Sequence, residues 1–282
     1  MEIGIGLPHQ DIVTVARRAE ELGFDSVAAA DVLIGDGTPW LEPIVVQSTV
    51  AAVTERVWLD FGVLSIPTRP VAMLAAQIQT LQHLSGNRVR LGLGIGGFPG
   101  TPFWKAVDAP TGNRGQLLDQ ALEILPKLIT GESALGVTLA PAAPAPLLLV
   151  AGGNIEPALR RVAKYGDFWL TAALTPAEVA EAKAKLQLYA AEYARPAPRI
   201  HLGLHSALND EPARERMVQQ LSAFYQKTPE QIAEITLTGG PEQAAERMAE
   251  YAEAGLDELG IGSDGSDILR QLDLIAEAGS ML

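Results

Sequence analysis

Two histidines lie where they could transfer protons. His205 closes a β-type run in which His201, Gly203 and His205 alternate with leucines, and His9 follows the first such run of the chain. Alternate residues of a strand share one face, so His201 and His205 are expected on the same side. Imidazole titrates near neutral pH and can act as a general acid or base. His205 and His9 are therefore the candidate catalytic residues, with an ordinary loop residue as the alternative for His9. His201 is expected to be a hydrogen-bonded core residue.

Glycine-rich segments mark the ends of other β-type runs, and few acids or bases accompany them. Glycine allows the backbone to approach a ligand closely. This composition is typical of a site that holds a large cofactor, which then carries the reactive chemistry. The segments of this kind include Gly62-Val63, Gly94 to Gly96, and Gly152-Gly153-Asn154.

The segment Gly152-Gly153-Asn154 could bind an anion. It joins an apolar run to a helix expected to begin near Glu156, so its N–H groups would lie at a helix N-terminus, which favours negative charge. Arg160 and Arg161, one turn further, could add positive charge. The alternative is a tight turn in which Asn154 caps the helix.

The stretch Gly92 to Gly97 matches the GxGxxG dinucleotide-binding motif by spacing alone. It begins within a β-type run and is followed by Phe98-Pro99-Gly100 rather than by a helix. The motif functions only as a strand, a tight turn and a helix in direct succession. We therefore expect no Rossmann-type site there.

Two charged residues are expected in the interior. Asp60 and Arg90 fall on the same predicted face of neighbouring strands, and buried charges need a partner. The pair is expected to have a structural role. No grouping of His, Asp and Glu has a spacing typical of a metal site, so no metal is predicted.

Eight β-type runs alternate with helical patterns, which predicts a single (β/α)8 barrel domain over residues 1–282. The active site of such a barrel lies at the carboxyl ends of its strands, where the histidines and glycines above are placed. Two helical patterns around Lys227–Leu237 predict a short helical excursion between the seventh and eighth strands. The predicted strands are Glu2–Leu7, Ser26–Ala30, Val57–Leu64, Val89–Ile95, Leu147–Ala151, Phe168–Thr171, Ile200–Ala207 and Glu258–Ile261.

The composition excludes several classes of protein. The 282 residues carry a net charge of −13 and include no cysteine, which excludes disulfide scaffolds, thiolate metal sites and cysteine nucleophiles. The acidic excess without a basic cluster argues against nucleic acid and anionic membranes as partners. The sequence has neither a membrane-spanning apolar run nor a signal peptide at its start, so a cytoplasmic protein is expected.

Several motifs together resemble the bacterial-luciferase-like oxidoreductases, which use flavin or the deazaflavin F420. The resemblance extends over nearly the whole chain, and the order of the motifs is more specific than any one of them. It rests on Phe61 to Pro67 with Arg69-Pro70, Leu84 to Gly96, Arg114, Gly152-Gly153, Tyr165 to Asp167, and Gly240 to Glu258.

The resemblance implies roles for individual residues. Gly62 and Val63 fall where family members have a non-proline cis peptide behind the flavin ring. Gly152, Gly153 and Asn154 fall where the cofactor phosphate is held, and Asp31 falls where F420 members place an aspartate near the ring edge.

Three positions depart from known subgroups of this family. Val32 and Gly97 replace the catalytic histidine and the general-acid glutamate of the F420 sugar-phosphate dehydrogenases, which argues against that activity. Ile95 replaces the arginine that binds the flavin phosphate in the luciferases proper, so light emission is not expected.

The function expected from this resemblance is hydride transfer to, or monooxygenation of, a small organic substrate, with F420 or reduced FMN as cofactor. The compact chain favours F420 slightly. An FMN member would need a separate reductase as partner, and a homodimer is expected by resemblance. One alternative is a non-catalytic flavin-binding protein. The last is an aldolase-type phosphate-binding barrel, which is disfavoured because no predicted strand contains a lysine.

Overall fold

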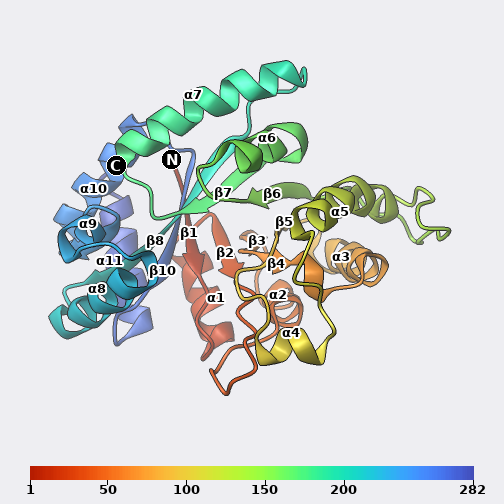
Figure 1. Cartoon of the computed structure of the whole chain (residues 1–282). Coiled ribbons are helices and arrows are strands. Elements are labelled where there is room, and N and C mark those ends of the chain that lie inside the picture. Colours follow the sequence, from red (N-terminus) through yellow and green to blue (C-terminus); the bar gives the residue numbers. More distant parts are fainter.

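The computed structural model describes all residues from 1 to 282 and shows a closed parallel barrel (Figure 1). The strands follow the order β10-β1-β2-β3-β5-β6-β7-β8, and β8 pairs with β10 to close the ring. This confirms the predicted (β/α)8 barrel, and each predicted strand has its counterpart. The strands are β1 (Glu2–Gly6), β2 (Ser26–Ala29), β3 (Trp58–Phe61), β5 (Val89–Gly94), β6 (Leu147–Ala151), β7 (Phe168–Ala172), β8 (Arg199–Leu208) and β10 (Glu258–Ser263).

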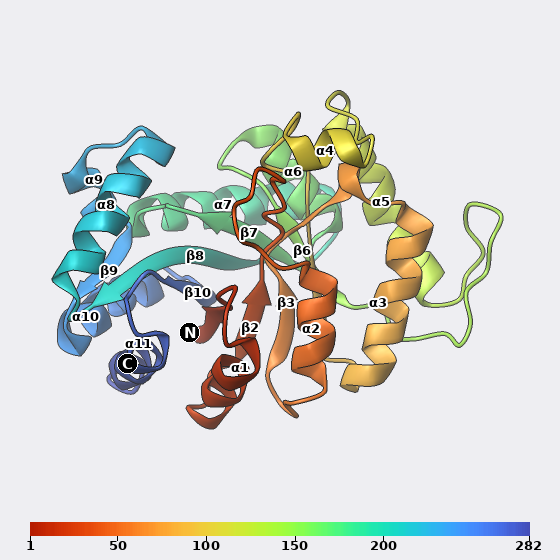
Figure 2. The ribbon, with the colours of Figure 1, turned by 90° about the horizontal axis from the view of Figure 1, so that it is seen from below.

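Helices surround the barrel (Figure 2), and most of them contribute buried apolar side chains to a core shared with the strands. Their starts follow local sequence signals: α7 begins with a capping box between Thr175 and Glu178, with Pro176 as its first residue. The main core of 55 buried residues fills the space between strands and helices. The helices are α1 (Ile12–Glu21), α2 (Pro43–Ala51), α3 (Val71–Ser85), α4 (Pro102–Ala106), α5 (Arg114–Ile129), α6 (Glu156–Tyr165), α7 (Pro176–Glu192), α8 (Glu211–Tyr225), α9 (Pro229–Ala233), α10 (Pro241–Glu253) and α11 (Ile268–Gly279).

The third strand is interrupted, although the sequence predicts one run over Val57–Leu64. β3 ends at Phe61 and the ladder resumes at β4 (Leu64–Ser65), because the chain bulges at the cis peptide bond between Gly62 and Val63. The cis bond is the one implied by the family resemblance. A short 3-10 turn (Ile66–Thr68) follows β4.

The segment between β8 and β10 is more than a helical excursion. The sequence predicts helical patterns through Leu237, but α9 ends at Ala233 and β9 (Thr236–Gly239) pairs in parallel with the end of β8. Thr-Leu-Thr-Gly has strand-type residues, yet the run is too short to show a period of two. A separate cluster of six buried residues packs beneath this extension. No helix of the chain has both the length and the apolar character needed to cross a membrane.

Candidate functional site

The interior of the barrel contains a buried ionic cluster, formed by Asp60, Arg90, His201 and Glu258. Arg90 Nε donates to Asp60 Oδ1 at 2.6 Å, which confirms the predicted pair, and its Nη1 and Nη2 donate to Glu258 at 2.7 and 2.6 Å. Three strands separate β5 from β10 in the ring, so Arg90 can reach Glu258 only across the barrel interior. These contacts therefore identify the inward face of each strand.

The pKa values of the two carboxyl groups in the ionic cluster are shifted in opposite directions. Burial raises the pKa of Asp60, although the Arg90 guanidinium beside it opposes this. Burial would also raise the pKa of Glu258, but His201 and Arg90 hold the pKa of that carboxyl well below its usual range. Asp60, His201 and Glu258 lie within 4.8 Å of one another, and the Arg90 guanidinium supplies the positive charge between the two carboxylates. The cluster is a structural unit, with His201 buried in it as expected.

Above the ionic cluster, toward the carboxyl ends of the strands, the inward-facing residues are small. Strand register places Ala28 beside Asp60 and Gly6 beside Ala28, while Gly262 lies beside His205. A Cβ added at Gly62 would come within 3.6 Å of Ala28 Cβ. We refer to this region as the barrel mouth. Solvent partly reaches its inward residues, which include Gly6, Ala28, Gly62, Gly203 and Gly262.

His205 lies in the barrel mouth and has a carboxylate partner. Its Nδ1 is 2.8 Å from Asp264 Oδ2, and its side chain is 44% exposed. Alternation along β8 carries it to the same face as His201, as predicted. Sequence reasoning missed Asp264, which follows β10. Closure of the predicted barrel could have indicated this contact, because it places the last strand beside the strand that carries His205.

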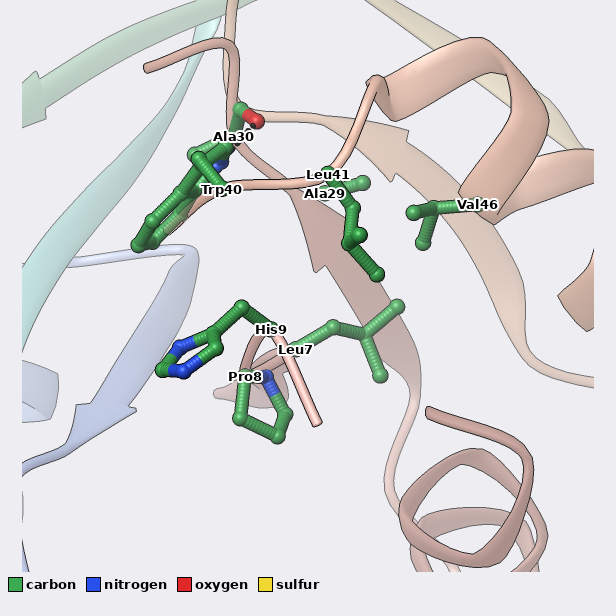
Figure 3. A pocket seen from close by; sticks show the side chains of 8 residues that line it. All are labelled: Leu7, Pro8, His9, Ala29, Ala30, Trp40, Leu41 and Val46. Carbon is green, nitrogen blue, oxygen red and sulfur yellow. Dashed lines mark hydrogen bonds between the residues drawn. The ribbon is translucent and has the colours of Figure 1, made fainter. Parts of the chain in front are cut away.

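His9 lies in the loop after β1, across from Trp40 (Figure 3). The two ring centroids are 6.4 Å apart, and Trp40 Nε1 donates to the Ala30 carbonyl at 2.7 Å. The hollow beside them has room for about one water molecule at most. His9 has no hydrogen-bond partner of its own within the chain, so its catalytic role stays a prediction. The hollow is lined by Leu7, Pro8, His9, Ala29, Ala30, Trp40, Leu41 and Val46.

Asp31 is bound into the loop structure at the end of β2. Its Oδ2 accepts from the Ser65 N–H at 2.9 Å and from Arg69 Nη1 at 2.5 Å, and its side chain is only 3% exposed. Arg69 also contacts Glu42 at 3.2 Å. The sequence did not show that Arg69 is its partner. This carboxylate ties the loops after β2 and β4 together, and its predicted place near a cofactor ring is untested.

The loop Gly152-Gly153-Asn154 presents unpartnered donors. The N–H groups of Gly153, Asn154 and Glu156 make no hydrogen bond within the chain, and Asn154 Oδ1 is buried without a partner. The alternative of an Asn154 cap is wrong, because α6 begins at Glu156 with Ile155 in the cap position and no side-chain cap bond. A Cβ at Gly153 would meet no atom within 4 Å. Free N–H groups at a helix N-terminus are suited to an anion.

The arginines of α6 do not support this loop. Arg160 is paired with Glu156 and Glu192, both at 2.7 Å, and Arg161 is paired with Asp119 at 2.6 Å. These carboxylates lie on α6 itself, α7 and α5, on the outer layer of the molecule. The expectation that the two arginines add charge at the loop is therefore not met, and backbone N–H groups are the donors there.

Packing within the chain accounts for the glycines at the end of β5. A Cβ at Gly94 would come within 2.9 Å of Val63 Cγ2. Gly96 has a φ of 79°, and a Cβ there would lie 2.4 Å from the Trp104 ring. Trp104 is almost fully buried and anchors α4, and Arg114 Nη1 donates to the Gly96 carbonyl at 2.6 Å. A cofactor contact at Gly94 or Gly96 stays a prediction.

Comparison with known proteins identifies the family. The sequence model of the luciferase-like monooxygenases matches residues 4–232. The chain belongs to this family. Its match to an uncharacterized protein of Mycobacterium tuberculosis is 34% identical over 179 residues, covering 59% of this chain and 60% of that protein. A 4-hydroxyprotoasukamycin monooxygenase of Streptomyces nodosus subsp. asukaensis is 33% identical over 85 residues, 30% of this chain and 22% of that enzyme. The match thus spans less than two thirds of either relative.

Solved structures share the fold of this luciferase-like chain. An F420-dependent secondary alcohol dehydrogenase in complex with an F420-acetone adduct superimposes with a TM-score of 0.83 at 17% identity, covering 98% of this chain and 97% of that one. Monooxygenase RslO1 from Streptomyces bottropensis gives 0.82 at 18% identity, with 99% and 98% covered. At these identities the likeness concerns the fold alone.

Proposed function

We propose that this chain is an oxidoreductase that binds F420 or reduced FMN at the barrel mouth and acts there on a small organic substrate. The observation that carries the proposal is the loop before α6, where three N–H groups and the buried Asn154 Oδ1 have no partner in the chain. Free N–H groups at the start of a helix favour an acceptor with negative charge, whereas the buried Asn154 Oδ1 needs a donor. A phosphorylated ligand would satisfy the N–H groups.

The residues present fit such a cofactor. Gly153 and Asn154 would hold its phosphate, and the cis peptide bond at Gly62-Val63 would support its ring within the mouth. The small residues of the mouth leave room for a flat ring system. When bound, the cofactor would supply redox chemistry, either with the substrate directly or, for FMN, with dioxygen.

Side chains of the protein itself would transfer protons and line the approach to the barrel mouth. His205 lies in the mouth with Asp264 beside it, and it could take a proton from a substrate or return one. His9 and Trp40 lie across from each other in the loops after β1 and β2. The slight preference for F420 rests on the compact chain alone, since monooxygenase RslO1 shares the fold to the same extent as the F420-dependent alcohol dehydrogenase.

A second candidate is a cofactor-binding protein without catalysis. It is favoured by Asp31, because Arg69 and a backbone N–H already bind the carboxylate oxygen that would otherwise be a charged group of the site. Turnover with a substrate panel distinguishes the two candidates, since a carrier would bind tightly and convert nothing.

Fluorescence titration of the purified protein with F420 and with FMN tests the proposal. Gly153→Leu would place a side chain in the open space above the loop, and we expect it to weaken binding by roughly tenfold or more. Ala197→Leu is the matched control, because Ala197 is exposed just before β8 at the opposite end of the barrel. Binding of neither cofactor, or equal binding by both variants, would refute the assignment of the loop.

A further inference from the structure

We propose that Asp264 is a positioning residue that holds the proton of neutral His205 on Nδ1 and leaves Nε2 unprotonated toward the barrel mouth. The inference deepens the proposed function and rests on it for its chemical use. A carboxylate has only acceptor sites, so at 2.8 Å the nitrogen facing Asp264 Oδ2 must carry the hydrogen. In a neutral imidazole the other nitrogen is then an acceptor.

The second nitrogen faces open space. His205 Nε2 has no hydrogen-bond partner in the chain, and the side chain is 44% exposed. Gly262 lies beside His205 in the ladder and has no side chain that could cover the imidazole. A substrate above the mouth can therefore reach Nε2, while Nδ1 is occupied.

The position of Asp264 is set by bonds that do not involve His205. Its own N–H donates to the Ser206 carbonyl at 2.8 Å. Two residues later, the N–H and hydroxyl of Ser266 donate to Asp210 Oδ2 at 2.8 and 2.7 Å. The loop is thus held on both sides of Asp264 by hydrogen bonds that do not involve the imidazole. Such preorganisation is what a positioning residue contributes to a catalytic group.

The other two inward or mouth histidines lack this arrangement. His201, on the same face of β8, has its Nδ1 3.5 Å from Glu258 Oε2 with no hydrogen bond, and it is buried. His9 has no carboxylate partner. The pairing at His205 is therefore specific to the site, and it assigns the role of proton-transfer residue to His205 rather than to His9.

An exposed ion pair would be the structural alternative, and it would contribute little to stability. A carboxylate that fixes a tautomer has a different signature, because its removal changes which nitrogen carries the hydrogen. In serine proteases the buried aspartate holds the catalytic imidazole in one tautomer in this way. The tautomer of His205 is thus a readout that a merely structural contact would not move.

The experiment is a long-range proton–nitrogen NMR correlation on protein labelled with 15N at histidine, recorded above the titration range of imidazole. His205→Gln assigns the signal. In the unmodified chain we expect His205 to carry its hydrogen on Nδ1. In Asp264→Ala the ratio of the two tautomers should shift by roughly tenfold or more toward Nε2–H, the worth of one charge-assisted hydrogen bond.

Asp267→Asn is the matched control, because it removes a carboxylate from the same loop while asparagine keeps the cap of α11. It should leave the tautomer of His205 unchanged. An unmodified chain with Nε2–H, or an Asp264→Ala variant with an unaltered tautomer, would overturn the proposal. A tautomer shift in a protein that binds neither F420 nor FMN would uphold the pairing while refuting the proposed function.

Discussion

The lower and upper halves of the barrel interior are built in opposite ways. Below, Arg90 and Glu258 are completely buried and the interior is filled by charged side chains that satisfy one another. Above, Gly6, Ala28 and Gly203 face inward and solvent reaches them. In this chain the ionic cluster fills the lower barrel interior, whereas the mouth leaves space for a ligand. Substitutions in the two halves should therefore have separable effects.

The largest effect is expected at the centre of the ionic cluster. Arg90→Met would leave the carboxylates of Asp60 and Glu258 buried without their main donor, which should lower the free energy of unfolding by about 3–5 kcal/mol. Denaturant-induced unfolding measures this. Arg247→Met is the control, because Arg247 pairs with Glu250 on the surface, and it should cost within about 0.5 kcal/mol. Equal costs would mean that the cluster does not support the barrel.

A glycine-to-alanine substitution in each half compares the two halves directly, and its expected effect on the unfolding free energy is smaller. A Cβ at Gly4 would lie 2.1 Å from Ser26 Oγ, which is itself bonded to Glu258, so Gly4→Ala should cost about 1–3 kcal/mol of unfolding free energy. A Cβ at Gly203 would meet nothing closer than 3.6 Å, so Gly203→Ala should be neutral or slightly stabilising. Chemical denaturation of the two variants measures both changes in unfolding free energy. A loss of stability in Gly203→Ala as large as that in Gly4→Ala would contradict the proposed difference between the two halves.

The loss of stability at acid pH should include a contribution from Glu258 of the ionic cluster, beside those of surface carboxyl groups whose pKa is also lowered, such as Asp210 and Glu211, and it is the smallest effect. Because the folded pKa of Glu258 is lowered, its contribution is present above the unfolded value of about 4.3 and is lost as the pH falls below it. The raised pKa of Asp60 acts in the opposite direction. Glu258→Gln should therefore flatten the loss of stability between about pH 4 and pH 2.

Thermal unfolding across this pH range measures how steeply stability falls with pH. This slope tests the prediction, whereas the absolute stability of the variant does not. Glu277→Gln, an exposed change on α11, serves as control and should keep the slope of the parent chain. An unchanged slope in Glu258→Gln would show that other carboxyl groups govern acid unfolding.

The sequence predicts the elements well because their signals are local. Strand alternation placed Asp60 and Arg90 on one face, and neighbouring strands brought them together. Periodicity could not reveal β9 (Thr236–Gly239), because four residues are too few to distinguish a strand from the end of a helix.

What the sequence missed depends on closure and on packing at a distance. Glu258 and Asp264 belong to the last strand and the loop after it, and they meet residues of β5 and β8 only once the ring is closed. Likewise, the Trp104 ring leaves no room for a side chain at Gly96, and the position of that ring depends on how α4 packs. Such contacts have no signature in the spacing of residues.

Strand β8 runs through both halves, with His201 in the ionic cluster and His205 in the mouth. Four residues of a strand span roughly 13 Å, which exceeds the distance at which substitutions usually influence one another. The two histidines share a rigid backbone yet can vary independently. Substitutions near His205 can therefore change substrate preference while the ionic cluster around His201 keeps the barrel stable. New substrates can be sought at the upper end of β8 without redesign of its lower end.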